Sequence, residues 1–193
     1  MNNLENMLSF SSREKRLMLK IARDTLFHYL NTRKTLDYDP GILPDSLMHN
    51  YGVFVSLHKG RALRGCIGVM DSREPLYKMI QHQVIAAASS DPRFPIVKFS
   101  ELPQLCIEIS ILGKMKIISV IDEIQLGKHG IYLKSGNLSG TMLPQVADSA
   151  GWTVEEFLGY CSRDKAGLGW EGWKTADIYV YSAEVFSEKN YLD

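Results

Sequence analysis

Cysteine is scarce in this sequence, and its three thiols lie far apart. Cys66, Cys106 and Cys161 form no Cys-x-x-Cys pair, and none has a nearby histidine at the spacing of zinc ligands. An odd number of widely separated cysteines excludes a disulfide framework and argues against a structural zinc site. We therefore expect three free thiols, with Cys106 and Cys161 as small buried hydrophobic residues.

The chain also lacks an excess of charge of either sign and any long hydrophobic run. Its 193 residues include 22 lysines and arginines against 22 aspartates and glutamates. A balanced chain has no overall field to hold a polyanion, so we expect no nucleic acid and no membrane as partner. The longest apolar run, residues 84–88, is far below the ~20 residues of a spanning helix. Residues 1–10 show no signal peptide, so we expect a cytoplasmic protein.

What is present is a series of short periodic segments in which helices and strands do not alternate strictly. Ser11 and Glu14 form a capping box that opens an amphipathic helix of roughly five turns. Strands are expected at 51–57, 62–69, 105–112, 131–134 and 178–186, and further helices at 75–88, from Pro144 and at 153–163. This order predicts an α+β fold with a mainly antiparallel sheet and helices packed against it.

The most informative segment is 63–68, of sequence LRGCIG, on the return strand of a hairpin whose turn we expect at residues 58–61. Glycines on both sides of Cys66 allow another group to approach the backbone closely. Arg64, two residues ahead, would point to the same side of the strand and stabilise a thiolate. The pattern makes Cys66 a candidate nucleophile.

A nucleophilic thiol needs a base and a group that orients the base. Among the five histidines, His129 is the best candidate base, because glycines flank it in the segment 127–130. Glu108, on the more polar face of its strand, would orient the imidazole or accept from Arg64. The sequence thus yields a Cys66-His129-Glu108 hypothesis, for which no metal and no cofactor is predicted.

Residues 91–95, of sequence DPRFP, predict a rigid extended connector because two prolines prevent a helix. Such a loop would present the guanidinium of Arg93 to a carboxylate or phosphate, which suggests a small anionic ligand. Asp91, Arg93 and Gln145 would form a polar wall beside Cys66. The alternative is that Arg93 binds Asp91 or the backbone and simply holds the loop.

The hallmark residues also have a purely structural interpretation. The glycines beside Cys66 would let a helix pack tightly on the hairpin, with the thiol filling a methyl-sized gap. Arg64 would then form a structural ion pair with Glu108 or Asp91. Both interpretations use the same residues.

Seven short motifs follow one another in a fixed order. They are LRGCIG at 63–68, DPRF at 91–94, EIS at 108–110, GKHG at 127–130, LPQV at 143–146, GW at 151–152 and KAG at 165–167. In this order they resemble the AMMECR domain family, most clearly over residues 51–186, with the opening helix also in place. The resemblance implies one domain over residues 1–193, with a larger and a smaller lobe whose boundary the sequence does not assign.

The resemblance implies further expectations about function. Members like this one are often grouped with a Memo-like protein and a radical-SAM protein as one system, and the family has no settled activity. The residues carried over as the site are Arg64, Gly65, Cys66 and Gly68.

Three functions follow from these observations. The first is an accessory or binding protein with a cleft near segment 63–68, lined by Arg64, Cys66 and Arg93. The second is an enzyme that uses Cys66 for covalent or redox chemistry, with His129 as base. The third is a scaffold in which these residues only stabilise the fold.

Overall fold

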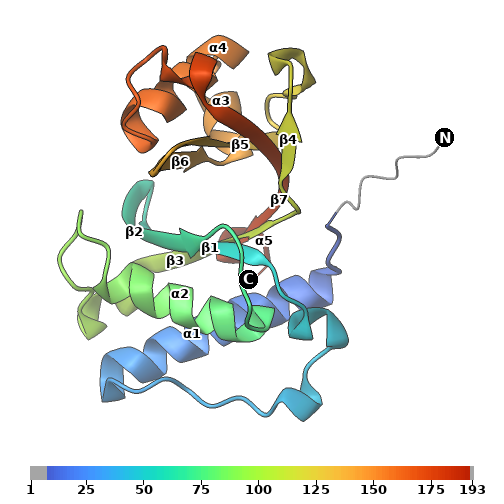
Figure 1. The fold of residues 1–193 in the computed structure, drawn as a ribbon. Helices are drawn as coiled ribbons and strands as arrows, with labels where there is room; N and C mark the ends of the chain where they lie inside the picture. Colours follow the sequence, from blue (N-terminus) through green and yellow to red (C-terminus); the bar gives the residue numbers. More distant parts are fainter. Residues whose placement is uncertain (1–7, 192–193) are drawn as a thin grey trace. The chain divides into compact units, whose positions relative to one another are not determined.

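The computed structural model describes residues 8–191, which fall into two compact units (Figure 1). The N-terminal unit consists of Ser9–Leu112 together with the chain from Glu184 onward. The inserted unit is built on Gly113–Ala183. The chain therefore leaves the N-terminal unit after Leu112 and returns to it for its last residues.

Two helices of the N-terminal unit begin where the sequence predicts. Helix α1, Ser12–Thr32, opens with a capping box in which the Ser11 hydroxyl accepts from the Glu14 N–H and the Glu14 carboxylate accepts from the Ser11 N–H. Its C-cap residue is Arg33, which has a left-handed backbone conformation with φ of 62°. The Arg33 N–H donates to the carbonyl oxygen of Tyr29 in the last turn. Helix α2, Leu76–Ser89, begins directly after Pro75. Proline disfavours a helical conformation in the residue before it, so the helix does not continue further toward the N-terminus.

Three strands of the sheet in this unit pair antiparallel in the order β2-β1-β3, so β2 lies at an edge. They are β1 Gly52–Lys59, β2 Ala62–Val69 and β3 Leu105–Leu112. One face is apolar and packs against α1 and α2. Its fully buried residues are Val53, Val55, Leu57, Ile107, Ile109 and Ile111. Because side chains alternate along a strand, Ser56, Cys66 and Glu108 occupy the opposite face.

The last residues of the chain complete the N-terminal unit. Glu188 begins the short helix α5, Glu188–Tyr191, and its buried carboxylate accepts from the Arg23 Nε at 2.8 Å and from the Ile107 N–H at 2.7 Å. Arg23 also donates to the carbonyl oxygens of Leu102 and Leu105. One ion pair therefore joins α1, β3 and the C-terminal segment.

The strands of the inserted unit pair antiparallel in the order β6-β5-β7-β4. Its strands are β4 Lys116–Ile118, β5 His129–Ser135, β6 Leu138–Met142 and β7 Asp177–Ser187, whose last residues belong to the N-terminal unit. Its helices are α3 Pro144–Ala150, α4 Val154–Tyr160 and a π-helical turn Cys161–Lys165. The core they enclose includes Ile131, Leu133, Phe157, Leu158 and Val180.

Short 3-10 turns connect these elements. They lie at Pro40–Ile42, Asp45–Met48, Phe99–Gln104, Ile121–Glu123 and Gly172–Thr175. No helix within residues 8–191 is both long and apolar enough to cross a membrane.

The predicted α+β class with a mainly antiparallel sheet is confirmed, and two local assignments are corrected. The hairpin turn was expected at 58–61, but β1 continues to Lys59 and the chain reverses at Gly60, whose φ of 63° suits a tight turn. His58 is therefore a strand residue. His129 is likewise the first residue of β5 rather than a loop residue, because it pairs with Ser182 of β7.

Candidate functional site

The backbone of Cys66 is held from outside the sheet by two side chains. Its N–H donates to the Asp91 Oδ2 at 2.8 Å, and its carbonyl oxygen accepts from the Arg93 Nη2 at 3.1 Å. Because β2 is an edge strand, both backbone groups would otherwise lack a sheet partner. We call Cys66, Asp91 and Arg93 the Cys66 clamp.

The two side chains of the clamp also bind each other. The Arg93 Nε and Nη2 donate to the two oxygens of Asp91 at 2.9 and 2.7 Å. The Asp91 side chain is 2% exposed, whereas that of Arg93 is 51% exposed. These hydrogen bonds hold the pKa of Asp91 well below its usual range and raise the pKa of Arg93. Asp91 is therefore ionised. In loop 91–95, Arg93 binds Asp91 and a backbone carbonyl, which is the structural role given above as the alternative.

Arg64 does not contact the thiol. Its Nε and Nη2 donate to the two oxygens of Glu101, each at 2.9 Å, and its Nη1 donates to the Pro95 carbonyl at 2.8 Å. The pairing register of β1 with β2 shifts at this position, so Arg64 lies in a bulge that redirects its side chain. The expected partners of Arg64, namely Glu108, Asp91 or a Cys66 thiolate, are therefore replaced by Glu101. The hydrogen bonds from Arg64 lower the pKa of Glu101 to about 2.

Both hallmark glycines are required by close packing. A Cβ on Gly65 would lie 2.1 Å from the carbonyl oxygen of Ala87, so α2 approaches β2 to a distance that only glycine permits. A Cβ on Gly68 would lie 2.2 Å from the ring of Phe54 on the neighbouring strand. These contacts agree with the structural interpretation of the two glycines.

The thiol of Cys66 is partly exposed on the polar face of the sheet. The Ser56 hydroxyl, opposite it on β1, donates to the Sγ of Cys66 at 3.2 Å. Ser56 is also opposite Glu108 of β3, so the three residues form a row across the sheet. The predicted position of Glu108 on the polar face therefore agrees with the register.

His58 is a neighbour of Glu108 that our sequence analysis missed. Its Nε2 lies 3.9 Å from the Glu108 Oε1, and it stands opposite Cys106 on the same face. The strict alternation of residues 53–57 continues to His58 and could have placed it there. We assigned it to a turn because Lys59 and Gly60 follow. Glu108 is thus positioned beside an imidazole, though a different one from the predicted His129.

His129 and Gln145 belong to the inserted unit, and their relation to Cys66 stays a prediction. The Gln125 N–H donates to the Nδ1 of His129 at 3.2 Å. This bond requires an unprotonated Nδ1, which places the proton of a neutral imidazole on Nε2. Gln145 lies in the first turn of α3.

The other two thiols differ in their surroundings. Cys161 is fully buried, and burial raises its pKa to about 12. Cys106 is half-buried on β3, so its expected full burial is wrong. Within the described part of the chain, no three histidine, cysteine, aspartate or glutamate side chains gather as metal ligands.

The fold and this site define an α+β protein with a clamped, glycine-flanked cysteine at a sheet edge. Residues 19–186 match the AMMECR1 family model, and the chain belongs to this family. It is 37% identical over 187 residues to a Methanopyrus kandleri protein, covering 91% of this chain and 89% of that one. It is 38% identical over 184 residues to a Methanosarcina acetivorans protein, covering 91% and 92%.

A solved structure agrees with the fold. The crystal structure of the uncharacterised protein PH0010 from Pyrococcus horikoshii superposes with a TM-score of 0.88 at 33% sequence identity. The similarity covers 93% of this chain and 94% of that chain.

Proposed function

We propose that this protein is an accessory protein that binds a protein partner through the surface of the Cys66 clamp. The partners that the family resemblance implies are a Memo-like protein and a radical-SAM protein. A cytoplasmic location fits this proposal, because a reducing compartment suits three free thiols.

The observation that supports this proposal most strongly is that Arg93 is exposed to solvent and yet held in one position. Half of its side chain is exposed, yet its guanidinium is fixed by Asp91 and by the Cys66 carbonyl. A flexible arginine loses rotamer freedom on binding, whereas a fixed one has already lost it. Arginine is also one of the residue types most often found among those that dominate protein interfaces.

The charge balance favours a protein partner over a small anion. The forks of Arg93 and Arg64 are each occupied by a carboxylate of this chain, Asp91 and Glu101. A free phosphate or carboxylate would have to displace an internal partner from either arginine. A polar protein surface can instead pack on the neutral pair without displacing it.

The test is the affinity of this chain for each purified partner from the same organism, measured by titration calorimetry. We expect Arg93→Ala to weaken binding more than about tenfold, as hot-spot arginines do. The matched control is Arg163→Ala, because Arg163 is also about half exposed, at 50%, and also bound to a nearby aspartate. Equal affinities for wild type and Arg93→Ala, or no binding to either partner, would overturn the proposal.

A second candidate function, thiol chemistry at Cys66, is favoured by the hydrogen bond from Ser56. A hydroxyl that donates to sulfur stabilises a thiolate, which is the reactive form. The test is the alkylation rate of Cys66 against pH in a variant that carries both Cys106→Ser and Cys161→Ser. A midpoint near or above about 8.5 contradicts an activated thiol, and a clearly lower midpoint supports it.

A further inference from the structure

We propose that the exposed face of α1 is a docking surface for an acidic, amphipathic helix of a partner protein. This α1 stripe consists of Arg13, Arg16, Leu17, Lys20, Asp24 and Phe27. It belongs to the N-terminal unit and involves none of the residues of the Cys66 clamp. The inference therefore stands independently of the proposed function.

The stripe follows from the helical period. Its residues recur three and four positions apart, so they form one band along the helix, with Arg16 at one edge of the band and Leu17 at the other. The opposite side carries the fully buried Met18, Leu19, Ile21, Ala22 and Leu26. From Arg13 to Phe27 the stripe extends over about 21 Å, or four turns. A partner helix of similar length could contact all of it.

Its charge is positive and only partly compensated. Arg13 and Arg16 are exposed and have no acidic partner within residues 8–191. Lys20 binds Asp24 at 2.8 Å, but the lysine is 66% exposed, and such surface pairs contribute little stability and exchange easily. Among the described residues the surface therefore offers two cations without an ion-pair partner, and a third at low cost, to the carboxylates of a partner.

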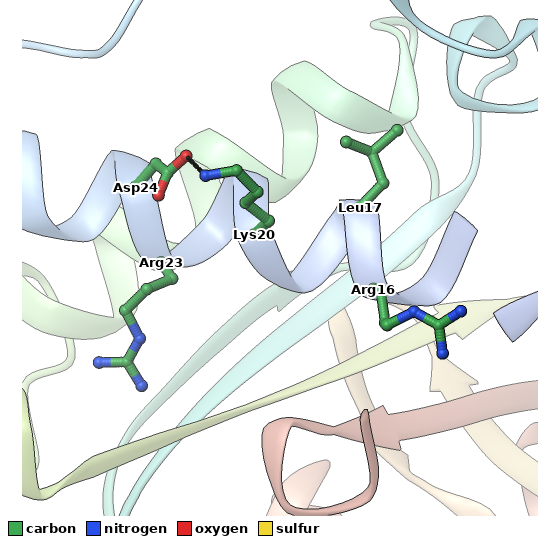
Figure 2. A pocket seen from close by; sticks show the side chains of 5 residues that line it. All are labelled: Arg16, Leu17, Lys20, Arg23 and Asp24. Carbon is green, nitrogen blue, oxygen red and sulfur yellow. Dashed lines mark hydrogen bonds and ion pairs between the residues drawn. The ribbon is translucent and has the colours of Figure 1, made fainter. Parts of the chain in front are cut away.

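An open hollow of about 460 Å³ lies on α1 beside these cations (Figure 2). It is lined by Arg16, Leu17, Lys20, Arg23 and Asp24, and Figure 2 shows Arg16 and Arg23 on one side of the helix and Lys20 and Asp24 on the other. Arg23 is engaged with Glu188 and adds no free charge. Leu17 and the aliphatic stems of Arg16 and Lys20 can receive one apolar side chain.

The far end of the stripe is aromatic. Phe27 is 49% exposed and meets the exposed ring of Phe99 edge to face, with ring centroids 5.5 Å apart. A stripe that carries cations at one end and exposed aromatic rings at the other suits a partner with both carboxylates and apolar side chains. Nucleic acid fits less well, because Asp24 lies within the stripe and the chain has no net charge.

The experiment uses the full chain and fluorescence anisotropy. The probe is a labelled synthetic helix of glutamate and leucine, about four turns long, with leucines on one face. A scrambled peptide of the same composition tests amphipathicity, and a single-stranded RNA tests general attraction of polyanions. Arg13→Glu with Arg16→Glu is compared with Arg73→Glu with Lys78→Glu, which changes the charge equally at exposed positions in and before α2.

We expect the amphipathic helix to bind more than about tenfold tighter than the scrambled peptide or the RNA, and to weaken in raised salt. The α1 double variant should lose more than about tenfold in affinity, the α2 double variant less than about threefold, and Phe27→Ser should also weaken binding. The proposal is overturned if both double variants lose affinity equally, or if the scrambled peptide or the RNA binds as tightly as the helix. Circular dichroism confirms that each variant is folded.

Discussion

The carboxylate of Asp91 binds the main-chain nitrogen of Cys66 at 2.8 Å, although 25 residues separate the two in the chain. This bond attaches the loop after α2 to the edge of the sheet. Together with Arg93 it gives an edge-strand residue the partners that a neighbouring strand would provide. The cysteine motif and the DPRF motif are thus two halves of one structural feature.

Removing the Asp91 carboxylate should destabilise the N-terminal unit strongly. Asp91→Ala leaves the Cys66 N–H and the Arg93 guanidinium without their acceptor, so we expect a loss of about 2–4 kcal/mol in the free energy of unfolding. Asp91→Asn keeps an acceptor and should cost about half as much. Urea denaturation measures both, with the exposed Asp37→Ala as control. A change in Asp91→Ala no larger than in Asp37→Ala would contradict a structural clamp.

Stability should fall in acid because the carboxylates of Asp91 and Glu101, among others, have lowered pKa values. Hydrogen bonds from Arg64 lower the pKa of Glu101 from its ordinary 4.5 to about 2, and Arg93 holds the pKa of Asp91 below its usual range. The unfolded chain then binds more protons than the folded chain below about pH 4.5. The stabilisation is complete above that pH and is lost as the pH drops toward 2.

Urea midpoints measured between about pH 5 and pH 2.5 check this sign. Glu101→Gln should flatten the decline, since it removes one of the carboxylates whose pKa is lowered. Asp37→Asn, at an exposed position of the same unit, should leave the slope unchanged. A midpoint that stays constant or rises toward low pH is incompatible with the two ion pairs.

Gly65→Ala should be poorly tolerated because its new methyl group meets backbone. The carbonyl of Ala87 lies 2.1 Å from the added Cβ, and α2 can yield only by moving as a whole. We expect a loss of about 3 kcal/mol in the free energy of unfolding, at the upper end of ordinary overpacking. Gly41→Ala is the control, because its added Cβ meets only the Asp39 side chain, at 3.2 Å. Similar losses of stability for the two variants would show that the close approach of α2 to β2 does not require glycine at position 65.

The three thiols should differ in their accessibility to alkylation. In native protein near pH 8, iodoacetamide should modify Cys66 and Cys106, which are half-buried, and spare Cys161, which is fully buried with its pKa raised to about 12. Peptide mass spectrometry before and after unfolding in urea reads each site separately. Rapid native labelling of Cys161 would mean that the core of the inserted unit opens readily.

The sequence predicts those contacts that connect residues close together in the chain. The capping box of Ser11 and Glu14 spans three residues, and the pair of Asp91 with Arg93 spans two on a loop stiffened by proline. In both cases the backbone conformation alone brings the groups together. These interactions could therefore be derived before the fold was known.

The partner of Arg64 could not be predicted in this way. Glu101 is 37 residues away, and which of many carboxylates reaches a guanidinium depends on the bulge and on the path of the loop after α2. The position of His58 is hard to predict for a related reason, because two residues reverse this hairpin where the sequence pattern predicts four. An error of two residues moved a histidine from the sheet to a turn.

The discontinuous N-terminal unit sets the order in which a nascent chain can fold. Arg23 is made early, but Glu188, which binds Arg23 and the Ile107 N–H of β3, is synthesised 165 residues later. The whole inserted unit, Gly113–Ala183, is synthesised in between. Until Glu188 has been synthesised, the Arg23 guanidinium and the Ile107 N–H lack their carboxylate partner. A chain truncated before Glu188 would therefore have an N-terminal unit that lacks the ion pair with Arg23 and the bond to the Ile107 N–H. We expect proteases to degrade such a chain.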